Sequence, residues 1–492
     1  MKRGSGILLG ISSLPGPFGI GTLGQDARNF VDKLKQCLQS YWQILPVSPT
    51  GFGDSPYQTF STFAGNPFFI DYEDLYCDGF LTKNALEKCT GWFGGEAHAV
   101  DYYLQYVGKP KALHLAWRHS AGRLEDEIKA FSQCHAEWIF DYALFMALKN
   151  EYQMKPFSEW PSDLAKRQPE ALKAAAKHLE ETIDYHVFVQ YLFFRQWDAL
   201  RSYANERGVS IIGDMPIYMA PDSADAWTGR ELLDKKGRVA GCPPDYFSQT
   251  GQLWGNPVYD WNEHARTGYD WWRRRIVHQL SLCDFLRIDH FRAFEAFYAI
   301  PADAKNAISG EWIPGPGMDF FSRLKKELGE LPLIAEDLGY LTPEVFQLLS
   351  ATGYPGLKVL QFAFSPDGTS IYLPHCYDHN CVVYTGTHDN DTTIGWYRGL
   401  GADERAFLDD YLDGVCEERL HWQLIRLAMS SVADVCIFPM QDVLGLPSSA
   451  RMNRPQSAQG NWQWRLLPGQ FDDAALQKLA GLTKLFGRSG QA

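Results

Sequence analysis

The sequence lacks the features of a zinc protein, of a disulfide-stabilised secreted domain and of a membrane protein. Its ten cysteines are scattered, with no CxxC pair and no cluster of cysteine with histidine, so the usual patterns of zinc sites and disulfide frameworks are missing. There is no HExxH motif and no EF-hand loop for calcium. No run reaches the roughly 18 apolar residues that a membrane-spanning helix needs. We therefore expect a cytoplasmic protein with reduced thiols, no bound metal and no membrane association.

Basic charge is also in short supply. The formal net charge of the 492-residue chain is −13, which argues against nucleic acid or an anionic membrane as the main partner. The first residues include two basic side chains and a short apolar run, but glycine and serine interrupt that run. It therefore does not predict a secretion signal. Apolar residues make up 45% of the chain, a proportion typical of soluble globular proteins.

Eight short apolar segments rich in β-forming residues recur along the chain, and most of them end in a polar cluster or a Gly/Pro turn. They are residues 6–15, 40–49, 209–218, 284–292, 331–339, 356–364, 381–390 and 433–445. Helical patterns such as "GQDARNFVDKLKQCL" and "TPEVFQLLSATG" lie between most of them. Nearly continuous apolar runs suit strands that are buried on both faces. The alternation predicts a parallel sheet of eight strands.

Eight such repeats favour an α/β fold, a closed (β/α)8 TIM barrel with insertions on the face where the strands end. We expect residues 1–492 to form a single catalytic domain. Two connections are too long for one crossover helix. Residues 50–208, between the second and third strands, predict a mostly helical insertion, and residues 219–283, between the third and fourth, an insertion rich in aromatic residues.

The segment "GIGTLG" at residues 19–24 matches the glycine pattern of dinucleotide-binding proteins, between a strand and a helix. The next strand, "SYWQILPVSP", carries no acidic residue that could bind a ribose hydroxyl, and no second nucleotide-binding half follows. The glycines are better explained by a tight first βα loop, and we expect no cofactor. An oxidoreductase that uses a dinucleotide would depend on this motif alone.

Acidic residues stand at the ends of four of the predicted strands: Asp214, Asp289, Glu336 and Asp389. In a (β/α)8 barrel the carboxyl ends of the strands build the active site. One acidic residue in such a position means little, because surface carboxylates are common. Four of them on one rim indicate a site.

The stretch "FLRIDHFRAF" places charges at the end of an apolar strand, where their burial is unfavourable without partners. Because side chains alternate along a strand, Arg287 and Asp289 share a side, and the arginine should keep the carboxylate ionised and oriented. In "LPLIAEDLG", alternation leaves open whether Glu336 or Asp337 faces the mouth of the barrel.

Two inward carboxylates on neighbouring strands suit retaining glycoside chemistry, in which one attacks the anomeric carbon and the other acts as acid and then as base. A third, Asp389, could stabilise the positive charge of the transition state or bind ring hydroxyls. The alternative is a structural ion-pair network that joins Asp289 to Arg287 and Arg292. The pattern alone favours catalysis over the network without excluding the network.

Longer motifs carry a resemblance to a known family. The chain closely resembles the amylomaltases, which are 4-α-glucanotransferases, also called disproportionating enzymes, of the α-amylase clan. The similarity extends from about residue 5 to residue 465, and it rests on several long motifs. These are "SSLPGPFGIGTLG", "SPYQTFSTFAGNP", "GDMPIYMAPDSADAW", "PPDYFSQTGQLWGNPVYDW", "FLRIDHFRAF", "IAEDLG", "GTHDNDT" and "GNWQWR".

The resemblance implies a role for each motif residue. Asp289 would be the nucleophile, Glu336 (not Asp337) the general acid and base, and Asp389 the stabiliser of the transition state. Other residues would hold the nucleophile or contact sugar: Arg287, Asp214, Tyr57, Trp254, His388 and Asn461, with Tyr246 and Phe362 as further aromatic surfaces.

The implied reaction is double displacement with retention, which moves an α-1,4-glucan segment to the 4-hydroxyl of glucose or of another glucan. Substrates would be α-1,4-glucan oligosaccharides and glucose. We expect the aromatic insertion around "DYFSQTGQLWG" to cover the site and exclude water. An α-glucan hydrolase of the same clan would share the three carboxylates. A non-catalytic glucan-binding protein would need only the aromatic residues.

Overall fold

The computed structural model describes residues 1–244, 248–455, 457 and 459–490. Its central sheet contains eight parallel strands, one for each of the eight predicted segments. The strands are shorter than those segments, and the first begins at Gly4, two residues before its segment. The strands are β1 (Gly4–Leu8), β2 (Tyr41–Gln43), β3 (Ser210–Met215), β6 (Phe285–Ile288), β9 (Leu333–Ala335), β10 (Gly356–Val359), β11 (Cys381–Tyr384) and β12 (Val435–Pro439). The prediction of eight parallel strands is thus confirmed.

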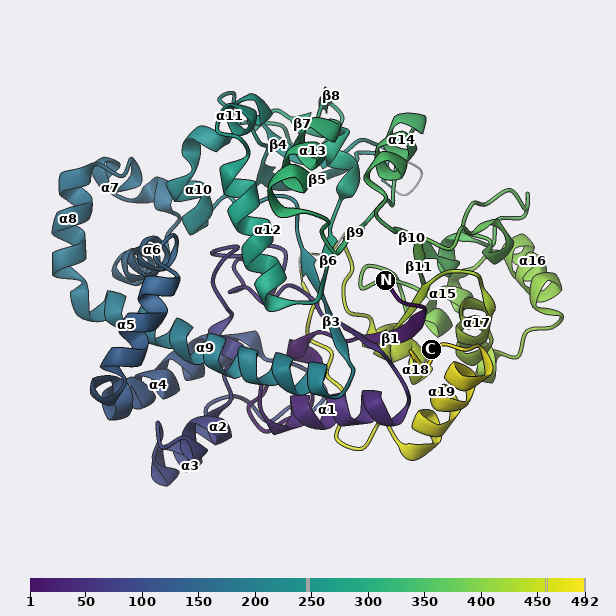
Figure 1. Ribbon diagram of the computed structural model, residues 1–492, viewed down its shortest axis with the longest axis horizontal. Coiled ribbons are helices and arrows are strands. Elements are labelled where there is room, and N and C mark those ends of the chain that lie inside the picture. The colour runs from purple at the N-terminus through teal and green to yellow at the C-terminus, as the bar shows by residue number, and fades with distance from the viewer. Residues whose placement is uncertain (245–247, 456, 458, 491–492) are drawn as a thin grey trace.

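The sheet is nearly closed into a barrel. Its strand order is β10-β11-β12-β1-β2-β3-β6-β9, so the two ends, β10 and β9, are consecutive along the chain. At this seam the Ala335 N–H donates a hydrogen bond to the Pro355 carbonyl over 2.9 Å. Figure 1 shows the strands at the centre of the molecule, with helices around them. The predicted α/β barrel is confirmed.

A large helical segment separates β2 from β3 and occupies the left side of Figure 1. Its α-helices are α2 (Tyr72–Cys77), α3 (Lys83–Thr90), α4 (Tyr102–Ser120), α5 (Glu125–Cys134), α6 (Ile139–Glu151), α7 (Ser162–Ala165), α8 (Pro169–His178) and α9 (Glu180–Glu206). The 27-residue helix α9 is apolar around much of its circumference, because it packs against several neighbours including α6, α4 and the barrel helix α1 (Gln25–Gln36).

Two buried glutamines of α9 hold the chain that leads from the barrel into this segment. The side-chain amide of Gln190 accepts from the N–H of Gly65 and donates to its carbonyl, over 2.7 and 2.9 Å. Gln196 binds the N–H and carbonyl of Asp71 in the same way. Each amide therefore replaces the partners that a neighbouring strand would supply to a buried backbone.

A second, smaller antiparallel sheet lies above the barrel in Figure 1, in the order β5-β4-β7-β8. It draws β4 (Val239–Cys242) and β5 (Gln252–Pro257) from the aromatic-rich connection, and β7 (Ala296–Ile300) and β8 (Glu311–Pro314) from the connection after β6. The sequence does not predict this sheet. Nearby helices are α10 (Ala224–Thr228), α11 (Trp261–Arg266), α12 (Asp270–Leu282), α13 (Gly317–Leu328) and α14 (Pro343–Thr352).

The C-terminal part returns to the start of the chain. After β11 and β12 come α15 (Thr393–Gly399), α16 (Ala402–Leu412), α17 (Leu420–Ser430), α18 (Met440–Val443) and α19 (Asp473–Leu485). The buried guanidinium of Arg488 donates to the carbonyl of Gly4 beside β1, and to the carbonyls of Met429 and Ala433. Both termini therefore lie close together (Figure 1). Among the described residues, no helix combines the length and apolar character required to cross a membrane.

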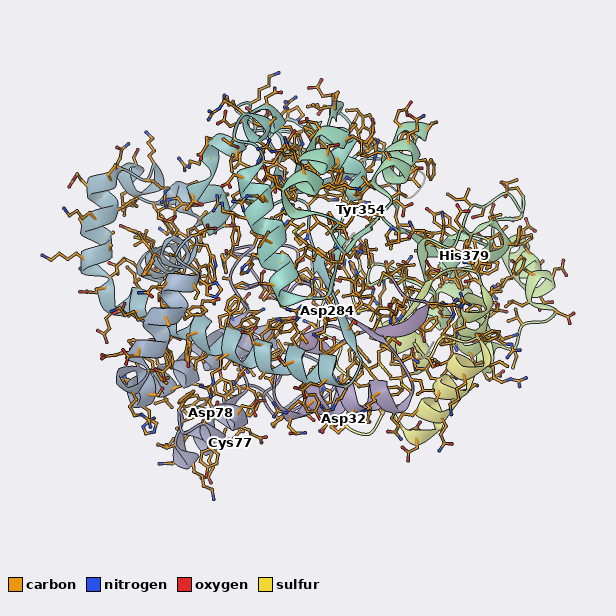
Figure 2. All side chains as sticks on the ribbon, in the orientation of Figure 1. Asp32, Cys77, Asp78, Asp284, Tyr354 and His379 are labelled. Carbon is orange, nitrogen blue, oxygen red and sulfur yellow. The ribbon has the colours of Figure 1, made fainter. Side chains whose placement is uncertain are left out.

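Opposite the ends of the strands, the start of β6 is fixed by Asp284, which Figure 2 labels near the centre of the view. Its carboxylate accepts a hydrogen bond from the Ile211 N–H of β3 over 2.7 Å and one from Arg201 of α9 over 2.9 Å. The side chain thus joins β6 to its neighbouring strand and to the helix outside the barrel.

The glycine-rich loop after β1 is packed too closely to accept side chains. A Cβ atom at Gly24 would lie 2.2 Å from the Asp71 carboxyl carbon, and one at Gly19, whose φ is +71°, would collide with the Phe93 carbonyl. Asp71 in turn accepts a 2.6 Å hydrogen bond from Thr22 of the same loop. The glycines of this segment therefore have a packing role.

A buried lysine on α4 lies beside the same loop. The Lys109 ammonium is 5.5, 4.6 and 4.7 Å from the ring centres of Phe18, Tyr72 and Phe93, and its nitrogen has no hydrogen-bond partner among the described residues. Burial lowers the pKa of Lys109 to about 7, although the nearby carboxylate of Asp71 opposes the change. The rings compensate in part for the lost hydration, because their faces attract a cation.

We expect Lys109→Met to change how stability depends on pH. The unfolded chain keeps Lys109 protonated to about pH 10.4, whereas the folded chain releases the proton at about 7. Between these values the unfolded state binds more protons, so this residue makes stability rise with pH. The variant should lose that contribution, about 1.4 kcal/mol per pH unit, in apparent melting temperatures from pH 7 to 9. Lys111→Met, which removes an exposed lysine of α4, is the control, and parallel profiles for parent and Lys109→Met would contradict the assignment.

Candidate active site

The four carboxylates that the sequence places at strand ends lie on one rim of the barrel. Asp214 is in the last part of β3, Asp289 follows β6 directly, Glu336 follows β9 directly and Asp389 is five residues beyond β11. Strands β3, β6 and β9 are neighbours in the sheet. The side chains therefore gather because parallel strands end at the same edge of the barrel.

Arg287 connects two of these carboxylates. It is the register partner of Asp214 across β3 and β6, and its Nη1 donates to both oxygens of Asp214 over 2.7 and 2.8 Å. Its Nη2 donates to Oδ1 of Asp289 over 2.9 Å. Asp214 and Arg287 are buried, while the Asp289 side chain is 28% exposed. As predicted, Arg287 and Asp289 lie on the same side of the chain, where they contact each other. Asp289 remains accessible to a ligand.

Glu336 is held by the backbone of two loops. The His290 N–H donates to its Oε2 over 2.6 Å and the Leu338 N–H to its Oε1 over 3.0 Å. His290 adopts a left-handed conformation with φ +57°, which is uncommon for a residue other than glycine. The chain turns there directly after Asp289, and this turn aims the N–H at Glu336.

Glu336 favours its protonated form. Burial raises the pKa of its carboxyl well above the ordinary value, and the negative charge of Asp289 raises it further, against the opposing effect of Arg287. Asp337 instead accepts a 2.6 Å hydrogen bond from the Leu357 N–H of β10. Of the two acidic residues that alternation could not separate, Glu336 is therefore the one grouped with Asp289.

Asp389 belongs to a chain of polar contacts on the other side of the barrel mouth. Its Oδ2 lies 3.2 Å from Nε2 of His388. Burial works against the charge of both groups, but their mutual attraction outweighs it, so the pKa of Asp389 is lowered and that of His388 is raised. The Tyr57 ring stacks on His388 with centres 5.0 Å apart, and its hydroxyl donates to Asp214 over 2.8 Å. This chain links Asp389 to the Arg287 cluster.

A loop from β12 toward the C-terminus contributes residues that the sequence reasoning missed. The Asn453 amide donates to Oδ1 of Asp389 over 2.6 Å, and Arg451 donates to the Asp389 backbone carbonyl over 2.5 Å. Trp462 packs against the rings of Tyr57 and His388. The quoted motif "GNWQWR" contains Trp462, but no pattern of spacing distinguishes Asn453 from other loop asparagines.

Asn461 makes hydrogen bonds within that loop. Its amide oxygen accepts from the Arg454 N–H over 2.9 Å, and its nitrogen donates to the Ser457 carbonyl over 2.7 Å. These bonds tie Asn461 to Arg454 and Ser457. The contact of Asn461 with sugar stays a prediction.

The aromatic residues named from the sequence lie at the same end of the barrel. The Trp254 ring of β5 meets the His290 ring edge-on, with centres 4.8 Å apart. Phe362, at the end of a short helical turn after β10 (Leu360–Phe362), is 40% exposed and packs against Tyr372. Burial raises the pKa of Tyr372, and the nearby acidic side chains of Asp337 and Glu336 raise it further. Tyr246 lies outside the described residues.

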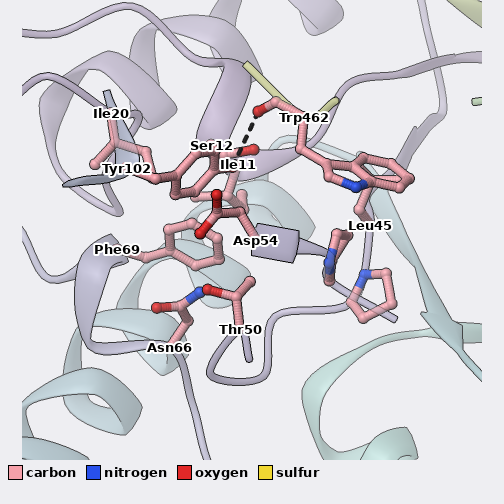
Figure 3. Close-up of a pocket in the computed structure, with 12 residues that line it drawn as sticks. Ile11, Ser12, Ile20, Leu45, Thr50, Asp54, Asn66, Phe69, Tyr102 and Trp462 are labelled. Atoms are coloured by element: carbon pink, nitrogen blue, oxygen red, sulfur yellow. Dashed lines mark hydrogen bonds between the residues drawn. The ribbon is translucent and has the colours of Figure 1, made fainter. Parts of the chain in front are cut away.

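Beside Trp462 lies a small cavity, bordered by the segments that follow β1 and β2 (Figure 3). It is lined by polar and apolar side chains that include Thr50, Asp54, Asn66 and Tyr102. The volume open to the centre of a water molecule is about 10 Å³, close to the minimum for one water. The Thr50 hydroxyl has no partner among the described residues, so a bound water would satisfy it.

Comparison with known proteins identifies the family of this chain. A family model described as 4-alpha-glucanotransferase matches residues 9–470. The chain belongs to this family. It is 47% identical to the 4-alpha-glucanotransferase of Synechocystis sp. over 99% of this chain and 98% of that protein. The identity to the enzyme of Thermus thermophilus is also 47%, over 98% and 99%.

The fold also matches those of solved amylomaltases. An amylomaltase from Streptococcus agalactiae, solved in complex with acarbose, has a TM-score of 0.96 to this structure and 40% sequence identity, over 99% of this chain and 100% of that one. The amylomaltase of Corynebacterium glutamicum, at 20% identity and a TM-score of 0.81, shows the same fold over 98% of this chain and 75% of that one. The resemblance to the amylomaltases is thereby confirmed.

The two loop asparagines provide a test of the site. Asn453→Ala removes a hydrogen bond to Asp389, so we expect kcat for glucan transfer to fall by about 10-fold to 100-fold with little change in KM, because a misplaced carboxylate acts mainly in the transition state. Asn461→Ala removes a predicted sugar contact but no bond to Asp389, so it should raise KM and lower kcat by less than about threefold. A larger loss of kcat for Asn461→Ala than for Asn453→Ala would contradict this view.

Proposed function

We propose that this 4-alpha-glucanotransferase moves segments of α-1,4-glucans to the 4-hydroxyl of glucose or of another glucan, with retention at the anomeric carbon. The mechanism rests on one observation: Asp289 and Glu336 lie at the ends of neighbouring strands, in contrasting environments. Asp289 receives a hydrogen bond from a buried guanidinium, whereas burial and the charge of Asp289 keep Glu336 protonated. A carboxylate beside a carboxylic acid is what retaining glycoside chemistry requires.

In the first step, an oxygen of Asp289 attacks the anomeric carbon and the bond to the departing oxygen breaks. Glu336 donates its proton to that oxygen, so the leaving glucan departs with a free 4-hydroxyl. The products are a glycosyl ester on Asp289 and ionised Glu336. In the second step, the 4-hydroxyl of an acceptor gives its proton to Glu336 and attacks the same carbon, which releases the Asp289 carboxylate. The two inversions together give retention.

The other polar residues stabilise this exchange. Asp389, whose side chain is 45% exposed, is oriented by Asn453 and His388 so that its charge can bind sugar hydroxyls and offset the oxocarbenium-like charge. Arg287 holds Asp289 in place, and Asp214 with Tyr57 balances the guanidinium. Trp254, Phe362 and Tyr246 would offer ring faces to sugar units on either side of the cleaved bond. The acarbose complex of the Streptococcus agalactiae amylomaltase supports an oligosaccharide as the ligand.

Transfer and hydrolysis share the glycosyl-enzyme and differ in what attacks it. Water is present at about 55 M, so an acceptor must win by position, and effective molarities of about 10⁵ M are attainable when groups are well oriented. Trp254 packed on His290 is the residue best placed to cover the nucleophile and exclude water. An α-glucan hydrolase remains the second candidate, because it needs the same carboxylates. We also propose that the enzyme works in the cytoplasm on soluble maltodextrins, where its cysteines stay reduced.

Incubation with maltotriose separates the two activities. A transferase yields glucose and a ladder of longer maltodextrins with little gain in total reducing ends, while a hydrolase yields glucose and maltose and a rising reducing-end count. We expect the ladder, and we expect Asp289→Asn to lower the rate by at least about 10³-fold without loss of the folded state by circular dichroism. Glu295→Gln, which changes an acidic residue paired with Arg292, is the control. Hydrolysis products without longer chains would reject the transferase assignment.

The raised pKa of Glu336 predicts the alkaline limit of activity. A general acid must be protonated in the free enzyme, so kcat/KM for maltotriose should be retained below the raised pKa and fall as the pH rises through it. An activated donor such as α-maltosyl fluoride needs no proton on its leaving group. Its rate of glycosyl-enzyme formation, followed by fluoride release, should therefore lack this alkaline limb. The same alkaline fall for both donors would show that another group controls the limb.

A further inference from the structure

Two large aromatic side chains lie exposed next to each other on the small sheet, outside the site described above. Trp312 on β8 is 37% exposed and Tyr340, in the loop after β9, is 65% exposed. Their ring centres are 6.2 Å apart and their planes differ by 25°. Adjacent exposed rings of this size are characteristic of binding surfaces. We call Trp312 and Tyr340 the outer aromatic pair.

A buried arginine backs the pair. The guanidinium carbon of Arg292 is 3.8 Å from the centre of the Trp312 ring and 5.9 Å from that of Tyr340. Because the two rings are only 6.2 Å apart, the guanidinium cannot lie between them in a straight stack, so it lies against one side of the pair. The Tyr298 ring meets the edge of Trp312 at 5.2 Å. These contacts fix the orientation of the tryptophan while the opposite side stays open to solvent.

The position of Arg292 is not explained by its own hydrogen bonds. Only its Nη2 has a partner, Glu295 at 3.2 Å, while Nε and Nη1 are buried without partners among the described residues. Burial lowers the pKa of this arginine, which reflects an unfavourable environment for a charge. The packing against the rings is the main compensation, since a guanidinium stacks well on an aromatic face. Burying a guanidinium with so few hydrogen bonds is unfavourable, so its retention beneath two exposed rings indicates that the rings have a function.

The pair is continuous with the candidate active site. Arg292 is three residues after Asp289, and Tyr340 is four residues after Glu336. The two loops are joined at the catalytic carboxyl, where His290 and Leu338 both donate to Glu336. Because Glu336 serves the oxygen between the transferred sugar and the leaving or accepting sugar, its loop lies on the acceptor side of the cleaved bond. A glucan bound on that side would extend along the loop that carries Tyr340.

We propose that the outer aromatic pair is a distal binding subsite for the acceptor side of an α-1,4-glucan. The proposal rests on the function proposed above. A glucose unit presents a face of C–H groups that packs on an aromatic face, whose π-system is negative. Within the described part of the chain, Arg292 is the only cation that stacks on these two rings, and it is buried, so a neutral polymer suits the surface better than an ionic ligand. The subsite would favour long chains over short ones.

The test compares short and long ligands in proteins that bind without turnover. In an Asp289→Asn background, calorimetry would give the affinity for maltotriose and for a short amylose. Replacing the pair by Trp312→Ala with Tyr340→Ala should weaken amylose binding about tenfold and change maltotriose binding less than twofold. Trp312→Phe with Tyr340→Phe keeps the ring faces and should retain most of the affinity. Phe346→Ala, which removes an exposed ring from α14, is the matched control.

The outcomes are distinct. Equal amylose affinity for the alanine pair and for the Phe346→Ala control, with maltotriose transfer intact in the active enzyme, would overturn the subsite and leave the proposed function standing. Absence of both maltotriose turnover and glucan binding in the parent would overturn the two together. If the alanine pair instead altered the oligomeric state in sedimentation without changing glucan affinity, a second copy of the chain would be the occupant, and the subsite would again be refuted.

Discussion

The burial of Arg287 between Asp214 and Asp289 is the constraint on which the site depends. A guanidinium inside a barrel is tolerated only when its partners are in place, and removing one partner from such a cluster typically destabilises a protein by about 3–5 kcal/mol. Arg287 and Asp214 are direct register partners on β3 and β6. A slip of one residue between these strands would turn one of them away from the barrel interior, so the charge pair and the strand register determine each other.

Other parts of the site follow from this cluster. Asp214 takes two bonds from Arg287 and one from the Tyr57 hydroxyl, which ties the loop after β2 to the barrel. Tyr57 stacks on His388, and His388 pairs with Asp389. One positive charge at the centre therefore orders carboxylates on β3, β6 and the loop after β11. The remaining carboxyl, Glu336, is buried beside Asp289 without an arginine of its own, so burial and the charge of Asp289 favour its neutral form.

Much of this arrangement could be predicted from the sequence because it depends on local patterns. Buried parallel strands are apolar along their length, so all eight were recognisable, and alternation in β6 placed Arg287 and Asp289 on one side. The pattern could not assign Arg292, because the left-handed turn at His290 ends the alternation and sends Arg292 to Glu295 rather than to Asp289. The role of Asn453 was not predicted, because its contact with Asp389 joins residues 64 positions apart in the sequence. The small sheet pairs β4 with β7, which come from two different connections. The sequence of a short strand does not specify the distant strand with which it pairs.

The left-handed turn at His290 also explains how one segment can serve two carboxyls with opposite requirements. Such a conformation is unfavourable by about 1–3 kcal/mol for a non-glycine residue, so the surrounding structure must impose it. At this position it does two things at once: it ends β6 at the point where Asp289 meets Arg287, and it directs the His290 N–H to Glu336. An N–H bound to a carboxylate stabilises the ionised form, which here opposes burial and the charge of Asp289. Burial and the charge of Asp289 keep the glutamic acid neutral in the resting site, while the His290 N–H is a donor ready for the charge that the residue acquires when its proton leaves.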